Sequence, residues 1–216
     1  MKHGWRVLFL ITALLASAAA QAQAQSREWN FQVFLDDRPI GHHHYTLRNS
    51  GDNGLERELK TEARFDVKIL FINAYRYAHD ASERWRGNCL ARLNARTDDN
   101  GEQSEVGVDQ QGERVAITTH RGREAVDGCI MTFAYWNPEI LRQTRLLNTQ
   151  TGRYEAVNIT ALGDENITVR GAPVLAKRYR ISGAKHPIEL WYGADRAWLA
   201  LQSTLAGGRR LRYELK

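Results

Sequence analysis

Three consecutive histidines, His42–His44, are the side chains of this sequence best suited to hold a metal ion. On a β-strand, His42 and His44 would point to one face of the sheet and His43 to the other. Two imidazoles spaced in this way can share a metal, but a metal site also needs further convergent ligands. Nothing in the sequence brings other histidines to them, so we expect solvent-facing histidines and no metal site. Those other histidines are His79, His120 and His186.

Glu83 and Trp85 form a second pair that could carry chemistry. They lie two residues apart on an expected strand and therefore share a face. A glutamate beside a tryptophan in apolar surroundings can have a raised pKa and act as an acid. No partner carboxylate is evident nearby, so we favour a structural role in which Glu83 pairs with one of the many arginines.

Motifs of known enzyme classes are absent. The segment Ser182–Lys185 matches S-x-x-K, but the two companion motifs of penicillin-recognising enzymes are missing. The sequence has no G-x-S-x-G, no H-E-x-x-H and no phosphate-binding glycine loop. It therefore predicts no catalytic residues and no cofactor, and a hydrolase with an unrecognised site is the least favoured function.

The chain has two cysteines, Cys89 and Cys129. An even number of cysteines in an exported protein is typical of a disulfide. The alternative is two buried free thiols, because cysteine is often a small buried residue. We expect a Cys89–Cys129 disulfide.

The N-terminus has the three parts of a cleavable export signal. Lys2 and Arg6 precede an apolar core of about ten residues, and Ala22-Gln23-Ala24 matches the cleavage pattern. A membrane-spanning helix needs about twenty apolar residues, so an uncleaved anchor is the weaker alternative. The sequence predicts a signal peptide over residues 1–24, a periplasmic chain from residue 25, and no transmembrane segment after cleavage.

The net charge of the chain and the distribution of its basic residues argue against a nucleic-acid partner. The chain of 216 residues carries a net charge of +5, and removal of residues 1–24 takes away Lys2 and Arg6 and lowers it to +3. The basic residues are dispersed and form no block of five. We therefore expect no nucleic-acid partner, since that would need a concentrated basic patch.

The remainder of the chain alternates between apolar and polar residues with period two, as in Trp29–Leu35. Turn residues recur every eight to twelve positions, which is typical of a barrel or sandwich. The most apolar segment, Val67–Ala78, is expected to be one strand, and Asn137-Pro138 predicts a short helix over residues 137–143. We predict an all-β, mainly antiparallel domain over residues 25–216. Its single curved sheet closes into a barrel or half-barrel around an apolar hollow, because a long sheet must bury one face and protect its edges.

Aromatic side chains are the candidates for lining that hollow. The densest run is Phe133-Ala134-Tyr135-Trp136, shortly after Cys129, and its alternative role is a core anchor at the start of the short helix. The predicted ligand-binding residues are Tyr75, Tyr77, Trp85, Phe133, Tyr135, Trp136 and Trp191.

The chain resembles an uncharacterised family of exported bacterial proteins, the domain of unknown function 6134. The resemblance is carried by Phe31–Gly41, by Tyr75-Arg76-Tyr77 with Glu83-Arg84-Trp85, by Phe133–Pro138, and by Leu190-Trp191-Tyr192. It implies a β-rich periplasmic domain and supplies no catalytic residues.

The leading hypothesis is a non-enzymatic β-barrel-like protein that binds an apolar or amphipathic, lipid-like ligand. The alternative is a structural or interaction module of the cell envelope, in which a sheet edge or aromatic patch holds a protein partner.

Overall fold

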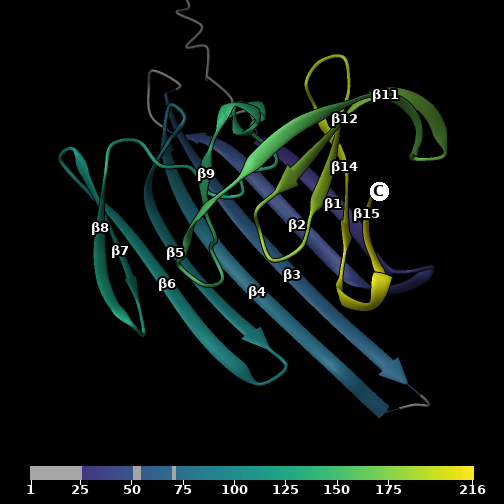
Figure 1. Ribbon diagram of the computed structural model, residues 1–216, viewed down its shortest axis with the longest axis horizontal. Helices are drawn as coiled ribbons and strands as arrows, with labels where there is room; N and C mark the ends of the chain where they lie inside the picture. Colours follow the sequence, from purple (N-terminus) through teal and green to yellow (C-terminus); the bar gives the residue numbers. More distant parts are fainter. Residues whose placement is uncertain (1–25, 51–54, 70–71) are drawn as a thin grey trace, which may run out of the picture.

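The computed structural model describes residues 26–50, 55–69 and 72–216. The predicted signal peptide, residues 1–24, lies outside the described residues. Fifteen strands and two short 3₁₀ helices make up the described chain (Figure 1). The strands are β1 (Ser26–Leu35), β2 (Arg38–Ser50), β3 (Glu56–Ile69), β4 (Ile72–Arg86), β5 (Cys89–Asp99), β6 (Glu102–Gln111), β7 (Arg114–Thr119), β8 (Gly122–Asp127), β9 (Arg145–Leu147), β10 (Tyr154–Ala156), β11 (Asn158–Val169), β12 (Ala172–Ser182), β13 (Ile188–Tyr192), β14 (Trp198–Thr204) and β15 (Arg210–Leu215).

Thirteen of these strands form one sheet in the order β11-β12-β13-β14-β15-β1-β2-β3-β4-β5-β6-β7-β8, and every pairing is antiparallel. The predicted all-β, mainly antiparallel class is confirmed. The outermost strands of the sheet, β8 and β11, do not pair with each other, so hydrogen bonds do not close the sheet into a barrel. A separate two-stranded sheet consists of β9 and β10.

Period-two alternation decides which face of the large sheet is buried. Trp29, Phe31 and Val33 of β1 are at most 2% exposed, whereas Asn30 between them is exposed. The same alternation in β5 buries Leu93 and Ala95. We call the buried side the inner face and the opposite side the outer face.

The expectation of one strand over Val67–Ala78 is wrong. β3 ends at Ile69 and β4 begins at Ile72, so the apolar segment belongs to two strands of one hairpin. Val67 is paired with Tyr75, and both side chains pack against the core. A continuous apolar run does not by itself distinguish one buried strand from two strands that present the same face.

Residues 128–157, which connect β8 to β11, form what we call the crossover segment. It contains the 3₁₀ helix η1 (Pro138–Arg142) and strands β9 and β10, and it lies over the large sheet in Figure 1. Its buried side chains join the same hydrophobic core as those of the inner face. The fully buried ones are Ile130, Met131, Ile140, Leu146 and Leu147. The centre of the inner face, where the sequence predicts an apolar hollow, is therefore packed with side chains of the chain itself.

The predicted helix over residues 137–143 is present as the five-residue 3₁₀ helix η1. Asn137 caps it, because its side chain accepts a hydrogen bond from the Glu139 N–H at 3.1 Å, and Pro138 follows as the first helical residue. This start agrees with the preference for asparagine at the cap and proline directly after it.

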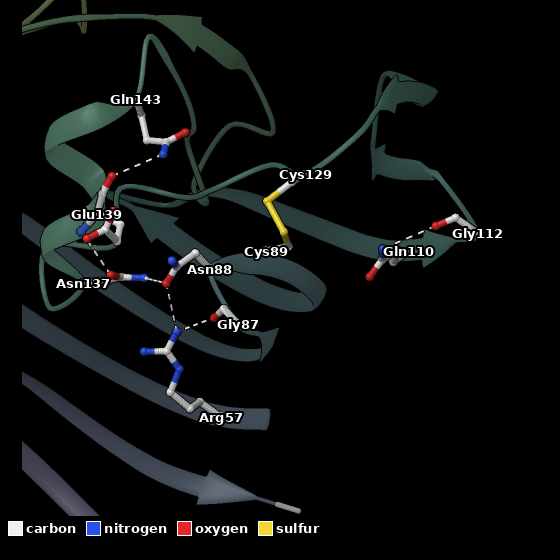
Figure 2. Close-up of a disulfide and its surroundings, with 10 residues drawn as sticks. All are labelled: Arg57, Gly87, Asn88, Cys89, Gln110, Gly112, Cys129, Asn137, Glu139 and Gln143. Atoms are coloured by element: carbon white, nitrogen blue, oxygen red, sulfur yellow. Dashed lines mark hydrogen bonds between the residues drawn. A yellow bond between two sulfur atoms is a disulfide. The ribbon is translucent and has the colours of Figure 1, made fainter. Parts of the chain in front are cut away.

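Three kinds of contact hold the beginning of the crossover segment to the sheet, and Figure 2 shows two of them, the disulfide and a chain of polar side chains. The predicted Cys89–Cys129 disulfide is confirmed and links the start of β5 to the segment. Next to it, the Leu90 N–H donates to the Ile130 carbonyl at 2.9 Å.

The third contact is a polar chain from β3 to η1. The Arg57 guanidinium donates to the Gly87 carbonyl and to Asn88 Oδ1. Asn88 Oδ1 in turn accepts from Asn137 Nδ2 at 3.1 Å, and the Arg57 guanidinium lies 4.8 Å from the ring centroid of Trp136. The cap of η1 is therefore tied to the β4–β5 turn.

Replacing both cysteines with serine is expected to lower the free energy of unfolding by up to about 4 kcal/mol. The disulfide closes a loop with a sequence separation of 40, so its loss gives the unfolded chain more freedom and releases one attachment of the crossover segment. Urea unfolding of the oxidised protein, the reduced protein and the double serine variant would measure this loss. Equal stability of all three would contradict it.

Candidate functional site

A cluster of aromatic rings occupies the inner face across β2, β3, β4 and β15. Phe65 and Tyr77 stack with their centroids 5.0 Å apart, and Phe65 also meets the ring of Tyr213 edge-on. The crossover segment adds Tyr135, whose ring contacts Trp198 at 5.4 Å. Trp198 links this ring to the rest of the cluster through Tyr45, 5.1 Å away.

His43 lies inside this aromatic cluster. Its ring stacks on Tyr45 at 4.2 Å, and its Nδ1 lies 3.2 Å from the Tyr45 hydroxyl and 3.3 Å from the Tyr213 hydroxyl. Burial, followed by the neighbouring histidines, holds the pKa of His43 well below its ordinary value, so the ring is neutral. We assign the ring proton to Nε2, since Nδ1 is within reach of two hydroxyl donors.

His43 Nε2 is the unusual atom of the cluster. It is buried and has no hydrogen-bond partner among the described residues, although the residue as a whole is only half-buried. A buried N–H group without a partner costs roughly 1–3 kcal/mol.

Three half-buried rings, Tyr75, Phe133 and Tyr135, pack against the same core.

The tyrosines of the cluster are held in their neutral form. Burial is the main cause that raises the pKa of Tyr77, Tyr135 and Tyr213 far above the ordinary value. The Tyr192 hydroxyl donates to the Tyr135 carbonyl at 2.7 Å, which fixes the crossover segment at this point. The cluster therefore combines apolar ring surface with uncharged hydroxyl and imidazole groups.

His79 is a second buried histidine on the inner face. Its Nδ1 lies 2.9 Å from Thr97 Oγ1, and its Nε2 lies 3.5 Å from Thr149 Oγ1 of the crossover segment. Burial lowers the pKa of His79 to about 4, so it is neutral at pH 7. Both ring nitrogens have a hydroxyl neighbour, which is what a buried polar group in a core requires.

Glu83 is fully enclosed between β4 and the crossover segment. It accepts a hydrogen bond from Trp85 Nε1 at 2.8 Å, and Thr132 Oγ1 lies 3.5 Å from each carboxylate oxygen. The favoured expectation that Glu83 pairs with an arginine is wrong, because its partners are neutral. Burial raises the pKa of Glu83 to about 7, partly opposed by these two hydrogen bonds.

The remaining residues predicted to bind a ligand lie in different places. Trp85 and Trp136 are buried and meet edge-on at 5.4 Å, so they join the sheet to the crossover segment. Tyr77 is buried in the aromatic cluster. Trp191 lies apart from the cluster, where it donates to Glu165 Oε2 and packs against the Arg178 guanidinium.

Catalytic groups do not assemble from the acidic and histidine side chains considered above. Glu83 and His79 lie on the inner face of one strand with Ala81 between them, whereas His120 lines a groove on the outer face. Within the residues that the structure describes, no three His, Cys, Asp or Glu side chains converge on a metal position. The described chain also contains no helix long and apolar enough to cross a membrane.

Comparison with known proteins gives a match to one protein family and a similar solved structure. A family model described as "Domain of unknown function (DUF6134)" matches residues 31–216. The chain belongs to the DUF6134 family. The match begins within β1 and includes every later strand, so the DUF6134 domain comprises the large sheet together with the crossover segment.

The DUF6134 domain also resembles a solved structure, a β-barrel-like protein of the domain of unknown function DUF1849 from Brucella abortus. The two agree with a TM-score of 0.62 over 88% of this chain and 94% of that one, at 9% sequence identity. At this identity the likeness supports the fold alone. No curated protein matches the DUF6134 chain.

Glu83→Gln is expected to remove a pH dependence of stability. The pKa of Glu83 is about 7 in the folded protein and 4.5 ordinarily, so the folded state holds a proton that the unfolded state releases between these values. This contribution to stability is complete below pH 4.5 and is lost as the pH rises to about 7, by roughly 3 kcal/mol.

Urea unfolding of both proteins from pH 4 to pH 8 would measure this difference. The wild type loses stability across that range because its buried carboxyl ionises. The amide of the variant stays neutral and can still accept from Trp85, so the variant should gain stability relative to the wild type as the pH rises. The exposed Glu102→Gln serves as the control and should follow the wild type. If the unfolding free energies of Glu83→Gln and the wild type changed with pH in parallel, the buried carboxyl would not be the source of the pH dependence.

Proposed function

We propose that this protein is a non-enzymatic, periplasmic binder of an amphipathic, lipid-like ligand, and that the aromatic cluster around His43 is its binding site. The observation that carries the proposal is the buried Nε2 of His43, which has no partner among the described residues and lies in an aromatic cluster that extends through Trp198 to the half-buried Tyr135. A ligand with one polar group and an apolar body fits that combination, because its polar group would accept from His43 while its body covers the rings.

The periplasmic location is supported by two features of the chain. The N-terminal sequence has the three parts of a cleavable export signal. The Cys89–Cys129 disulfide requires an oxidising compartment, such as the bacterial periplasm, to form and persist. Fractionation of cells that produce the full chain would test this part of the proposal.

The position of the crossover segment defines where a ligand would enter. The segment packs the centre of the inner face, so the ligand would meet the side of the segment that carries Phe133 and Tyr135. These two rings lie 6.3 Å apart, and both keep accessible surface. Trp85 and Trp136 would support the site from within the core and would not touch the ligand.

A fluorescent fatty acid, 11-(dansylamino)undecanoic acid, is a suitable probe for this site. The wild type should bind it saturably, and both His43→Gln and Phe133→Ala should weaken binding. Burying one phenylalanine side chain contributes about 1.5–3 kcal/mol, so we expect a loss of about tenfold or more for Phe133→Ala.

Phe34→Ala is the matched control. This half-buried phenylalanine packs on the outer face under the Arg212 guanidinium and should not affect the probe. Native mass spectrometry of protein prepared without detergent should also detect a co-purified amphipathic molecule. Absence of both saturable probe binding and a co-purified molecule would refute the proposal.

The envelope-interaction alternative is favoured by one observation, the exposed strand β11 at the edge of the sheet. Most residues of β11 are exposed, and the exposed large apolar side chains Leu162 and Leu175 lie on β11 and its partner β12. An unpaired strand edge can accept another extended chain.

A photo-crosslinking residue at Leu162 would test this alternative in cells. A specific protein adduct that is lost when the crosslinker is moved to the outer-face position Phe34 would support a partner at β11. Lipid adducts or no adduct at Leu162 would count against it.

A further inference from the structure

His42 and His44 lie together on the outer face of β2, opposite in direction to His43. Their rings stack with centroids 4.5 Å apart and planes inclined by 28°. His44 is exposed and His42 is half-buried. Among the described residues, neither ring forms a hydrogen bond or an ion pair, so their nitrogen lone pairs remain available.

The surface around His44 is a polar groove of about 1230 Å³ that runs across the outward side chains of β1 to β7. Four carboxylates and two basic side chains line it, which favours a cation over an anion. They are Glu28, Glu62, Asp80 and Glu105 against Lys60 and Arg96.

The basic side chain opposite His42 is already paired with carboxylates. Arg64 lies opposite His42 in the pairing of β2 with β3, and its guanidinium donates to both oxygens of Asp80 at 2.8 and 2.9 Å. Glu62, opposite His44, lies 3.7 Å from the same guanidinium. A cation held by the two imidazoles would therefore face a surface with surplus negative charge.

We propose that His42 and His44 together bind one divalent transition-metal ion of the class that imidazole prefers, Zn²⁺, Ni²⁺ or Cu²⁺. Metal–imidazole bonds are about 2.0–2.1 Å long, so the two coordinating nitrogens lie at most about 4 Å apart. In the stacked arrangement the lone pairs lie in nearly parallel ring planes, so both rings would have to turn about their side-chain bonds to point one nitrogen each at the metal. Since no third ligand from the described part of the chain converges there, water would complete the coordination.

This site is independent of the proposed inner-face ligand site. Side chains of neighbouring residues on a strand point to opposite faces, so the sheet itself separates the metal from the aromatic cluster. Loss of either site leaves the other intact, and the two proposals fail or succeed separately.

Isothermal titration calorimetry at pH 8 with NiCl₂ would test the proposal, using the chain without a polyhistidine tag. The wild type should bind one equivalent saturably, and His42→Gln and His44→Gln should each lose this binding. His120→Gln is the matched control, because His120 lines the same groove and should leave binding unchanged.

A second measurement needs no variant. Addition of ZnCl₂ to the ¹⁵N-labelled wild type should shift the imidazole resonances of His42 and His44 and leave those of His79 and His186 in place. No saturable binding by the wild type, binding retained by both His42→Gln and His44→Gln, or shifts confined to other histidines would overturn the proposal.

Discussion

An open antiparallel sheet of thirteen strands has one apolar face that must be shielded from water, and this requirement explains most of the structure. Hydrogen bonds do not close the sheet, so the strands alone do not enclose that face. The crossover segment covers it and contributes buried side chains such as Ile140 and Leu147. The disulfide at Cys89, the hydrogen bond at Leu90 and the Arg57 polar chain all act where this segment meets the sheet.

Glu83, His79 and His43 are polar groups enclosed by this covering, and they differ in whether their polar atoms have partners among the described residues. Glu83 and His79 have hydroxyl or indole neighbours, and two of those neighbours, Thr132 and Thr149, come from the crossover segment. His43 has hydroxyl partners for Nδ1, but within the described ranges it has none for Nε2. All three groups share one face of the sheet, and His43 lies among the rings of Tyr45, Phe65 and Tyr213 in the aromatic cluster.

Sequence patterns predicted the local features of this fold well. Alternation in β1, the cap at Asn137 and the pairing of Cys89 with Cys129 each depend on neighbouring residues or on simple counting. The face shared by Glu83 and Trp85 follows from strand geometry, and it places the indole N–H beside the carboxylate.

Features that depend on distant parts of the chain could not be predicted in this way. The apolar segment Val67–Ala78 belongs to two strands because both sides of a hairpin face the core. One of the two neutral partners of Glu83 is Thr132, which lies 49 residues away in the sequence, and no local pattern brings it to Glu83. For the same reason, the sequence suggested a hollow where the crossover segment packs: its apolar residues could line a cavity or fill one, and only the three-dimensional contacts distinguish the two.

The three consecutive histidines of β2 show how strongly register determines chemistry in such a sheet. Pairing with β1 and β3 places His43 beside Phe31 and Ala63 on the inner face, and the alternation of the strand places His42 and His44 on the outer face. A shift of one residue would exchange these environments and expose the alternating core residues of the strand. Tyr45 and Ile40, which flank the triplet and are buried, hold the register in place. Histidines next to one another in the sequence therefore have different environments. His43 is enclosed and neutral on the inner face, whereas the rings of His42 and His44 lie on the outer face and form no hydrogen bonds with the described residues.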